Sequence, residues 1–356
     1  MMDQKDIIKA IAENETIEKM DLSGVDLSGA DLGGGRFENV VFNRSDFRGA
    51  QIARTGFQNC SFAGAFFDNT DLTRVDLREM DLAGASFKGA LMHETLFDES
   101  NLSGCDFGGA RISWSLMQDA DLSGASFVGA EFEKAVLQDS NCENADFTGA
   151  RLYKTIFLDA RLGGAVLRAK TMDKVLLAGC DLAGQDFSKM HFREVNFSNA
   201  MLENASFADA DISVCAFTGA DMTGANLERA VAHQSMFFQA NLKNATLRKA
   251  ILAQSYLGEA NMEGAILAGA VLEGASLEKA KAAGADFTGC NCRYLELSYA
   301  DISYAVFADA ALYMARMHKT VDEGVDWKKT APAKYRGSPA GLAEAEDWKA
   351  PAAIPD

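Results

Sequence analysis

The chain has 356 residues, with 51 Asp or Glu against 34 Lys or Arg, so its formal net charge is −17. Such an acidic balance disfavours direct binding to nucleic acid or to anionic membranes, which attract Lys and Arg. No run of about 18 apolar residues is present, so no membrane-spanning helix is expected. Residues 1–6 lack the basic start and apolar core of a signal peptide. We therefore expect a cytoplasmic protein, with secretion by a signal-independent system as the alternative.

The first segment, residues 1–19, predicts a short amphipathic helix over residues 3–12. Ile7, Ile8 and Ile11 form its apolar side, and Asp3 is a suitable N-cap. The favoured interpretation is a lid over the segment that follows. A helix that binds a partner is the alternative.

Residues 20–319 consist of sixty consecutive pentapeptides in one unbroken phase. The clearest run, residues 120–134, reads ADLSG ASFVG AEFEK. With the large apolar residue as position i, this position recurs at every fifth residue from Leu22 to Met317, and position i−2 is mostly Ala. A five-residue period fits neither a helix nor a flat strand. It suits a chain that turns a corner every five residues, with one small and one large side chain inside.

Four such sides close a square coil of twenty residues, which predicts about fifteen coils stacked at the roughly 4.8 Å spacing of paired strands. Phenylalanine usage supports this coil length. When the positions i are sorted by residue number modulo twenty, one column holds ten Phe and the opposite column holds seven. Phe107 should therefore stack between Phe87 and Phe127. Glycine at i+2, as at Gly24 and Gly104, tolerates the backbone angles of a tight turn.

These Ala-Asp-Leu-x-x and Ala-Asn-Leu-x-x repeats resemble the pentapeptide-repeat family, whose fold is a right-handed quadrilateral β-helix. The resemblance covers residues 20–319 and implies an all-β parallel solenoid. It implies little about function, because one fold hosts many activities. Position i−2 departs from the pattern at Lys170, Gln185, Gly35 and Leu295. We expect local distortion near Lys170 and Gln185, with their polar ends reaching outward.

The seven cysteines all fall on inward positions: Cys60, Cys105, Cys180, Cys215 and Cys290 at i−2, and Cys142 and Cys292 at i. Cysteine at such positions acts as a small hydrophobic residue, so neither disulfides nor a metal site is expected. His93, His191 and His233 lie several coils apart and cannot converge on one ligand. With no nucleophile, base or phosphate-binding motif in view, the sequence predicts no enzyme and no cofactor.

One outer column departs from the repeat pattern. Position i−1 is Asp in sixteen repeats, yet along one column, at twenty-residue spacing, it is apolar. This apolar stripe consists of Leu96, Leu116, Val136, Ile156 and Leu176, and after Asn196 and Ala216 it resumes at Met236 and Tyr256. Residues twenty apart should stack on one side of the solenoid.

Charged residues flank the stripe on both sides. Two residues before it runs the basic row, Arg74, Lys134, Lys154 and Lys174, which Glu94 and Trp114 interrupt. Three residues after it runs the acidic row, Glu79, Glu99, Asp119, Asp139 and Asp159. An apolar strip between rows of opposite charge is typical of a protein interface. The alternative is that Leu and β-branched residues only stabilise the sheet by ladder packing.

The last segment, residues 320–356, is expected to begin with a cap in which Val321, Val325 and Trp327 cover Leu312 and Met317. All four Pro lie beyond Lys328, which is typical of a flexible tail. Part of this tail, residues 341–349, could order on a partner through Leu342 and Trp348.

Three functions are consistent with these features. The favoured hypothesis is a non-enzymatic scaffold that binds a protein partner or a second copy of itself. The resemblance also implies a DNA mimic that binds a type II topoisomerase, because some members of the family protect gyrase. The remaining alternative is a secreted effector or an accessory subunit of a secretion system.

Overall fold

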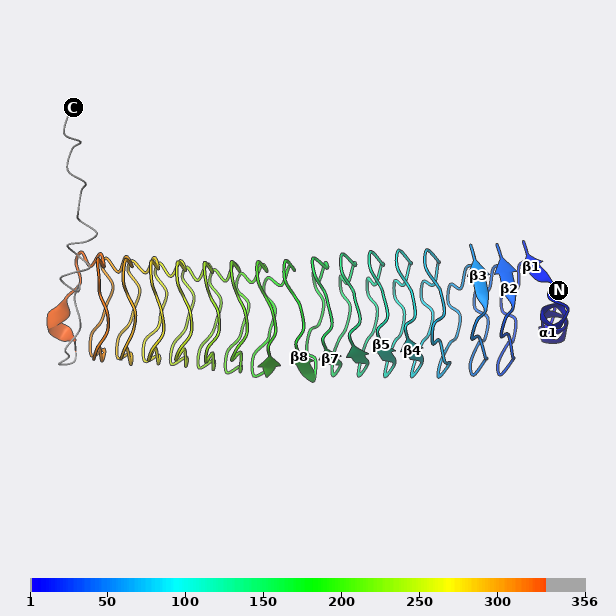
Figure 1. The fold of residues 1–356 in the computed structure, drawn as a ribbon, viewed down its shortest axis with the longest axis horizontal. Coiled ribbons are helices and arrows are strands. Elements are labelled where there is room, and N and C mark those ends of the chain that lie inside the picture. Colours follow the sequence, from blue (N-terminus) through cyan, green and yellow to red (C-terminus); the bar gives the residue numbers. More distant parts are fainter. Residues whose placement is uncertain (1, 331–356) are drawn as a thin grey trace, which may run out of the picture. The chain divides into compact units, whose positions relative to one another are not determined.

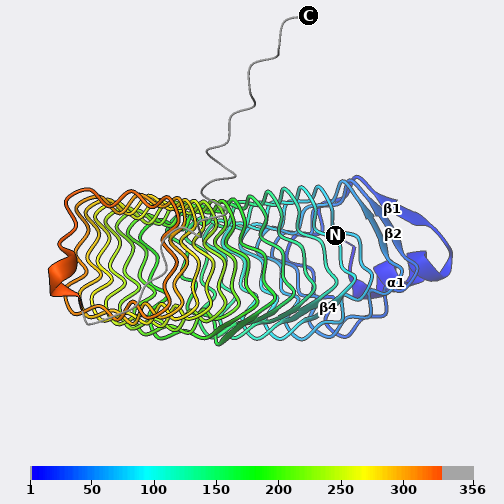
Figure 2. The ribbon, with the colours of Figure 1, turned by 60° about the vertical axis from the view of Figure 1, so that its left-hand side comes forward.

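The structure is a computed structural model that describes residues 2–330. The chain divides into two compact units, Met1–Ala205 and Ser206–Asp356. In each unit the backbone winds into a parallel β-solenoid, seen from two sides in Figures 1 and 2. The all-β quadrilateral solenoid expected from the pentapeptides is therefore confirmed.

In the first unit, each strand pairs in parallel with a strand twenty residues further on. One sheet has three strands, β1 (Thr16–Glu18), β2 (Arg36–Glu38) and β3 (Gly56–Gln58). A second has six: β4 (Leu91–His93), β5 (Arg111–Ser113), β6 (Glu131–Glu133), β7 (Arg151–Tyr153), β8 (Thr171–Asp173) and β9 (Phe192–Arg193). In every pair the central apolar residue is buried and matched to its counterpart, as Phe37 is to Phe57.

The other sides of the coils pair through single parallel bridges rather than strands. They keep the same offset, as between Asp106 and Ser126 in the first unit. The second unit pairs in this way too, from Ser206 with Asn226 to Asp301 with Val321. Named strands therefore fall on nine turns, fewer than the fifteen coils expected, because a five-residue side leaves little length for a strand between two corners.

The core of the first unit contains a stack of phenylalanine rings. Phe107 lies between Phe87 and Phe127, with ring centroids 5.0 and 4.8 Å apart and interplanar angles of 5° and 9°. All three side chains are fully buried. The stacking expected from the Phe columns is confirmed, and each ring gains both area burial and the attraction of an offset aromatic pair.

Helix α1 (Gln4–Ala12) begins at the expected N-cap, Asp3. The Asp3 carboxylate accepts from the Asp6 amide, and the Asp6 carboxylate accepts from the Asp3 amide, which closes a capping box. Ile7 and Ala10 are buried, whereas Ile8 is 39% exposed. The prediction that Ile8 belongs to the inner face is therefore wrong, because one turn of helix places residues three apart, Ile7 and Ala10, on the same side.

The glycine at inward position 35 is explained by this helix. A Cβ at Gly35 would lie 3.0 Å from the Cδ1 atom of Ile11. Ile11 thus occupies the space that a small side chain fills in other repeats. The helix packs on the first coils, as the lid interpretation expects.

The distortion expected near Lys170 and Gln185 is present. Lys170 is exposed, and its amide donates to the Ala150 carbonyl at 2.7 Å. The Gln185 side chain is half-buried, and its Nε2 atom donates to the Ala165 carbonyl at 2.9 Å. A backbone group that the distorted coil would leave unpaired thus gains a side-chain partner.

At the end of the second unit, Trp327 opens a short 3-10 helix, η1 (Trp327–Lys329), and stacks on Phe307 at 5.3 Å. The expected cap is only partly correct. Val321 is 52% exposed and Met317 is half-exposed, whereas His318 is buried against the Tyr299 ring at 5.2 Å. Leu342 and Trp348 lie outside the described residues. Over the part of the chain that is described, no helix has the length and apolarity to cross a membrane.

Candidate protein-interaction face

The stripe residues of the first unit form one ladder. Parallel bridges link Leu96 to Leu116, then continue through Val136, Ile156 and Leu176 to Asn196. Each of the five apolar residues is half-exposed, so each presents part of its side chain to solvent. The structure thus brings the five residues together on one outer side.

In the second unit, the corresponding ladder runs from Ala216 through Met236 and Tyr256 to Ser276. Met236 is 49% exposed and Tyr256 is 40% exposed. The Tyr256 ring stacks on Phe238 at 5.6 Å and covers Gly258, where a Cβ would meet the ring at 2.8 Å. This ladder is apolar over only two coils.

The corners beside the stripe carry large side chains in a left-handed backbone conformation. In the basic row, φ is 59° at Arg74 and 56° at both Lys134 and Lys174. In the acidic row, φ is between 54° and 59°: Glu79, Glu99, Asp119, Asp139 and Asp159. This conformation costs residues other than Gly roughly 1–2 kcal/mol each, with Asn and Asp the best tolerated.

The remaining corners of the same coils are mostly glycine. Gly84, Gly104 and Gly124 occupy one corner, with φ between 64° and 67°. Gly89, Gly109, Gly129 and Gly149 occupy the next, with φ between 63° and 72°. Beside the stripe, side chains therefore occupy strained corners whose counterparts on the other sides of the same coils are mostly glycine.

Several residues of the basic row have partners within their own unit. Arg74 Nε donates to Glu94 Oε2 at 2.6 Å, and this bond lowers the pKa of Glu94. The Glu94 that interrupts the row is thus paired with Arg74. Lys134 lies over the exposed Trp114 ring, with Nζ 3.8 Å from the centroid. Lys174 pairs with Glu194 at 3.6 Å.

The acidic row differs from the basic row in its ion pairs. Its five carboxylates are on exposed residues, and within residues 2–330 none of them forms an ion pair. Asp139 accepts one hydrogen bond from Gln138 Nε2 at 3.0 Å. The row therefore presents a line of negative charge at coil spacing, with Arg78 acting on Glu79 only at longer range.

The stripe also lacks a hydrogen bond that other repeats make. At Asp121, the carboxylate accepts from the Ser123 amide at 3.0 Å, and at Asp146 it accepts from the Thr148 amide at 2.8 Å. This turn bond holds the corner, because the short side chain bonds the backbone two residues on. An apolar residue such as Ile156 cannot accept it. At Leu116 the Gln118 amide donates to Asp98 Oδ1 instead, at 3.0 Å. At the other stripe positions the turn is thus less favourable than with Asp.

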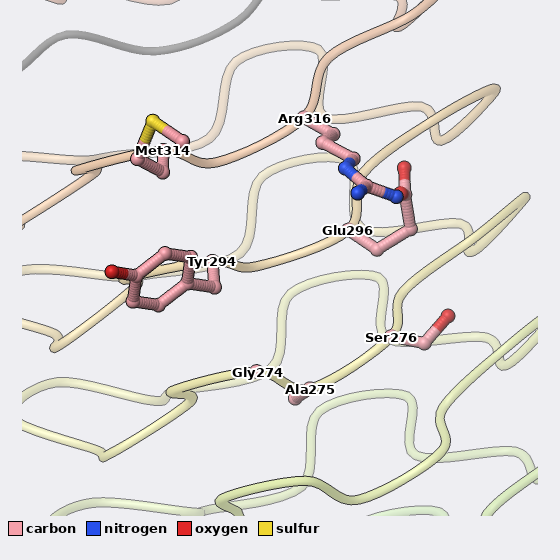
Figure 3. A pocket seen from close by; sticks show the side chains of 7 residues that line it. All are labelled: Gly274, Ala275, Ser276, Tyr294, Glu296, Met314 and Arg316. Carbon is pink, nitrogen blue, oxygen red and sulfur yellow. The ribbon is translucent and has the colours of Figure 1, made fainter.

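The second unit has a hollow of about 370 Å³ on the same side as Met236 and Tyr256. Figure 3 shows Tyr294 and Met314 at one edge and the Arg316 side chain extended toward Glu296. Arg316 Nη1 lies 3.5 Å from Glu296 Oε2. Sequence reasoning missed this hollow, because Gly274 and Ser276 are residues that the repeat also carries at these positions in other coils.

Buried thiols line the core. All seven cysteines are free and buried. Burial raises the pKa of Cys105, Cys142 and Cys180 to about 12 in each case. On the surface, His93 Nδ1 lies 2.9 Å from Ser113 Oγ. Across residues 2–330, no three His, Cys, Asp or Glu side chains are grouped so that they could hold a metal ion.

The fold and its twenty-residue register define a β-solenoid repeat protein. The family model described as pentapeptide repeats matches residues 21–56, 53–89, 77–113, 115–152, 130–168 and 255–293. The model described as pentapeptide repeat region matches residues 190–267. Together they cover most of the chain, which belongs to the pentapeptide-repeat family. A comparison with curated proteins found no match.

Several solved structures are similar to this chain. Trypsin-treated QnrB1, described as a plasmid-mediated fluoroquinolone resistance protein, is 22% identical, with 62% of this chain and 90% of QnrB1 covered and a TM-score of 0.34. HetL, from the cyanobacterium Nostoc and involved in heterocyst differentiation regulation, is 21% identical, with 89% and 98% covered and a TM-score of 0.15. A thylakoid-lumen protein from Arabidopsis thaliana is 28% identical, with 37% and 68% covered and a TM-score of 0.11. Similarity at this level says nothing about what the chain binds.

Proposed function

We propose that the protein is a non-enzymatic scaffold whose first unit binds a protein partner on the apolar stripe. The single observation that carries the proposal is the placement of side chains at left-handed corners. Charged residues stand at these strained positions on both sides of the stripe, whereas the other corners of the same coils are mostly glycine.

Ladder packing alone does not account for this arrangement. A stripe that only stabilised the sheet would gain from Asp at i−1, which bonds the turn, and from glycine at the corners, which relieves the backbone. At the stripe, apolar residues stand in place of Asp and charged residues stand in place of glycine. Both replacements make the fold less stable. Surface chemistry that disfavours the fold is typical of a binding site.

A partner over the stripe would gain from both its apolar and its charged parts. Covering the half-exposed Leu and Ile side chains contributes roughly 25 cal/mol per Å² of apolar area, less the cost of association. Rows of opposite charge favour one orientation of the partner and speed its encounter. The unpaired acidic row supplies one half of that complementarity.

The DNA-mimic hypothesis has weaker support. The net charge of −17 favours it. However, duplex DNA carries one phosphate per about 1.7 Å of axis, whereas a row of carboxylates at coil spacing supplies one per about 4.8 Å. The basic row beside it further reduces the likeness. We expect no inhibition of gyrase supercoiling; inhibition that Asp119→Lys with Asp139→Lys removes would favour the mimic.

The test of the scaffold is a stripe variant, Leu116→Asp with Ile156→Asp. Aspartate is the usual residue at i−1, so the fold should tolerate it, and at position 156 it could accept from the Leu158 amide. Burying these charges against an apolar partner surface should weaken binding at least about 100-fold. Partners captured from the source cells are identified, purified and titrated against both forms.

The matched control is Phe66→Asp with Val166→Asp. These residues also occupy i−1, on the opposite side of the coil, and are 43% and 42% exposed. The control should keep the partners that the stripe variant loses, with unchanged circular dichroism for both. Equal binding by the stripe variant and the native chain would show that the stripe is only ladder packing.

A further inference from the structure

We infer that the partner of the apolar stripe is a second copy of this chain. The two stripes would meet face to face, with both first units running in the same direction about a two-fold axis parallel to the stacking direction of the coils. This inference rests on the proposed function, since it names the occupant of the same face.

The two charged rows make the face self-complementary in one orientation only. Rotation about an axis along the stack exchanges the two edges of the face, so the basic row of one copy lies opposite the acidic row of the other. Rotation about an axis across the stack keeps the edges in place, so like rows oppose each other. Like charges across an interface are unfavourable, and the parallel arrangement is therefore selected.

The register of the two rows fits this arrangement without any shift along the stack. A two-fold axis along the stack keeps each coil level with its own copy. Lys134 then faces Asp139, and Lys154 faces Asp159. Arg74 also lies level with Glu79, although its guanidinium is paired with Glu94 of its own copy. Glu94 would face Glu99, but its charge is already paired with Arg74 at 2.6 Å.

The charges available on each row also match this partner. The acidic carboxylates lack an ion pair within the described chain, so they are open to a cation from outside. Within residues 2–330, Lys154 Nζ lies 5.1 Å from the Tyr153 ring centroid and forms no ion pair, which leaves its three donors available. A different protein would need an acidic row opposite this basic row and a basic row opposite this acidic row. A second copy of the chain already has both rows in these places.

The size of the face predicts a weak and reversible dimer. From Arg74 to Lys174 the ladder rises by five coils, or about 24 Å, and a five-residue side spans about 17 Å. Each copy thus offers about 400 Å², and the pair about 800 Å², below the roughly 1,200–2,000 Å² of stable complexes. Self-association should therefore depend steeply on concentration.

The first experiment is sedimentation equilibrium of the whole chain from about 1 to about 200 μM, the range in which a weak dimer dissociates. We expect a reversible monomer–dimer equilibrium that added salt weakens. At the two coils that these residues occupy, Lys134→Glu with Lys154→Glu makes both edges of the face acidic. Asp139→Lys with Asp159→Lys makes both edges basic there. Each pair of substitutions alone should weaken self-association at least about tenfold.

An equimolar mixture of the two charge variants is the decisive test of the parallel arrangement. The acidic face of one then meets the basic face of the other, so an equimolar mixture should recover dimers that neither variant forms alone. The substitutions suit their sites, because Glu99 and Lys134 already adopt φ of 59° and 56° at such corners. Failure of the mixture to associate would overturn the inference.

Orientation is tested with Leu96→Cys and Leu176→Cys. Facing sheets lie about 10 Å apart, which suits a short bis-maleimide linker rather than a disulfide. Leu96→Cys should cross-link to itself, and a mixture of the two variants should give no 96-to-176 product. The native chain is the control, since its cysteines are buried.

A chain that stays monomeric at all concentrations, or dimers that survive both charge variants, would overturn this inference. Cross-linking of position 96 to position 176 would overturn it as well. None of these results would remove the proposed function, because a different protein could still occupy the stripe. Retention of every captured partner by the Leu116→Asp, Ile156→Asp variant is the separate result that would.

Discussion

Removing two side chains from the acidic row should stabilise the protein. In the variant Glu79→Gly with Glu99→Gly, both residues leave corners at which φ is 59°. Relief of the left-handed backbone stabilises the fold by roughly 1–2 kcal/mol per site. Against this, glycine costs about 0.5–1 kcal/mol per site, because it raises the entropy of the unfolded chain. Neither glutamate has an ion pair within residues 2–330 to lose. The net gain is therefore about 0.5–1 kcal/mol per site.

Urea unfolding followed by circular dichroism measures this change as a shift of the midpoint to higher urea. The reciprocal variant, Gly84→Glu with Gly104→Glu, places the same side chains at corners of the same coils. A Cβ at either glycine meets no atom within 4 Å, so the loss expected there comes from the backbone alone. If Glu79→Gly with Glu99→Gly instead lowers the midpoint, these side chains stabilise the fold, and the central support for a binding face is removed.

Three further outcomes are expected. In denaturant melts, Phe107→Ala should lower the free energy of unfolding by about 3–5 kcal/mol because it opens a cavity in a fully buried stack. The control Lys88→Ala should change it by less than about 0.5 kcal/mol. Equal effects would contradict the core assignment. Iodoacetamide at about pH 8 should leave Cys142 unlabelled in the native protein, since its pKa is raised to about 12, and label it after denaturation, as mass spectrometry would show. The Ser28 hydroxyl lowers the pKa of Asp26 below 3.8, so this stabilisation is complete above that value and is lost as the pH falls through the folded-state pKa. The thermal midpoint should drop on acidification, and by less in Ser28→Ala; an equal drop in both would argue against this contribution.

The fold could be predicted from the sequence because every side chain that determines the coil repeats in phase. The Phe columns alone predict Phe107 between Phe87 and Phe127, which is where it lies. The ends were harder because no period constrains them. In helix α1 Ile8 is exposed although it was expected on the apolar side, and burial of His318 with exposure of Met317 depends on packing at the last turn.

Only part of the candidate face could be predicted from the sequence. The spacing of Leu96 to Leu176 predicted a ladder, and bridges at twenty-residue offset pair these residues. The sequence showed glycine at some corners but not that Lys134 and Glu99 share their left-handed backbone. That cost becomes apparent only when φ is known, and within these coils it separates the flanks of the stripe from corners that are mostly glycine.

The twenty-residue register also constrains how the chain can gain or lose length. Insertion or deletion of one pentapeptide would keep every inward side chain inward, so the core would accept it. It would also carry all later residues of that unit one side further around the coil, and the stripe would be cut at that point. Only steps of twenty residues lengthen or shorten the ladder without breaking it. The uninterrupted run from Leu96 to Leu176 means that this part of the chain holds one phase for both its core and its outer face.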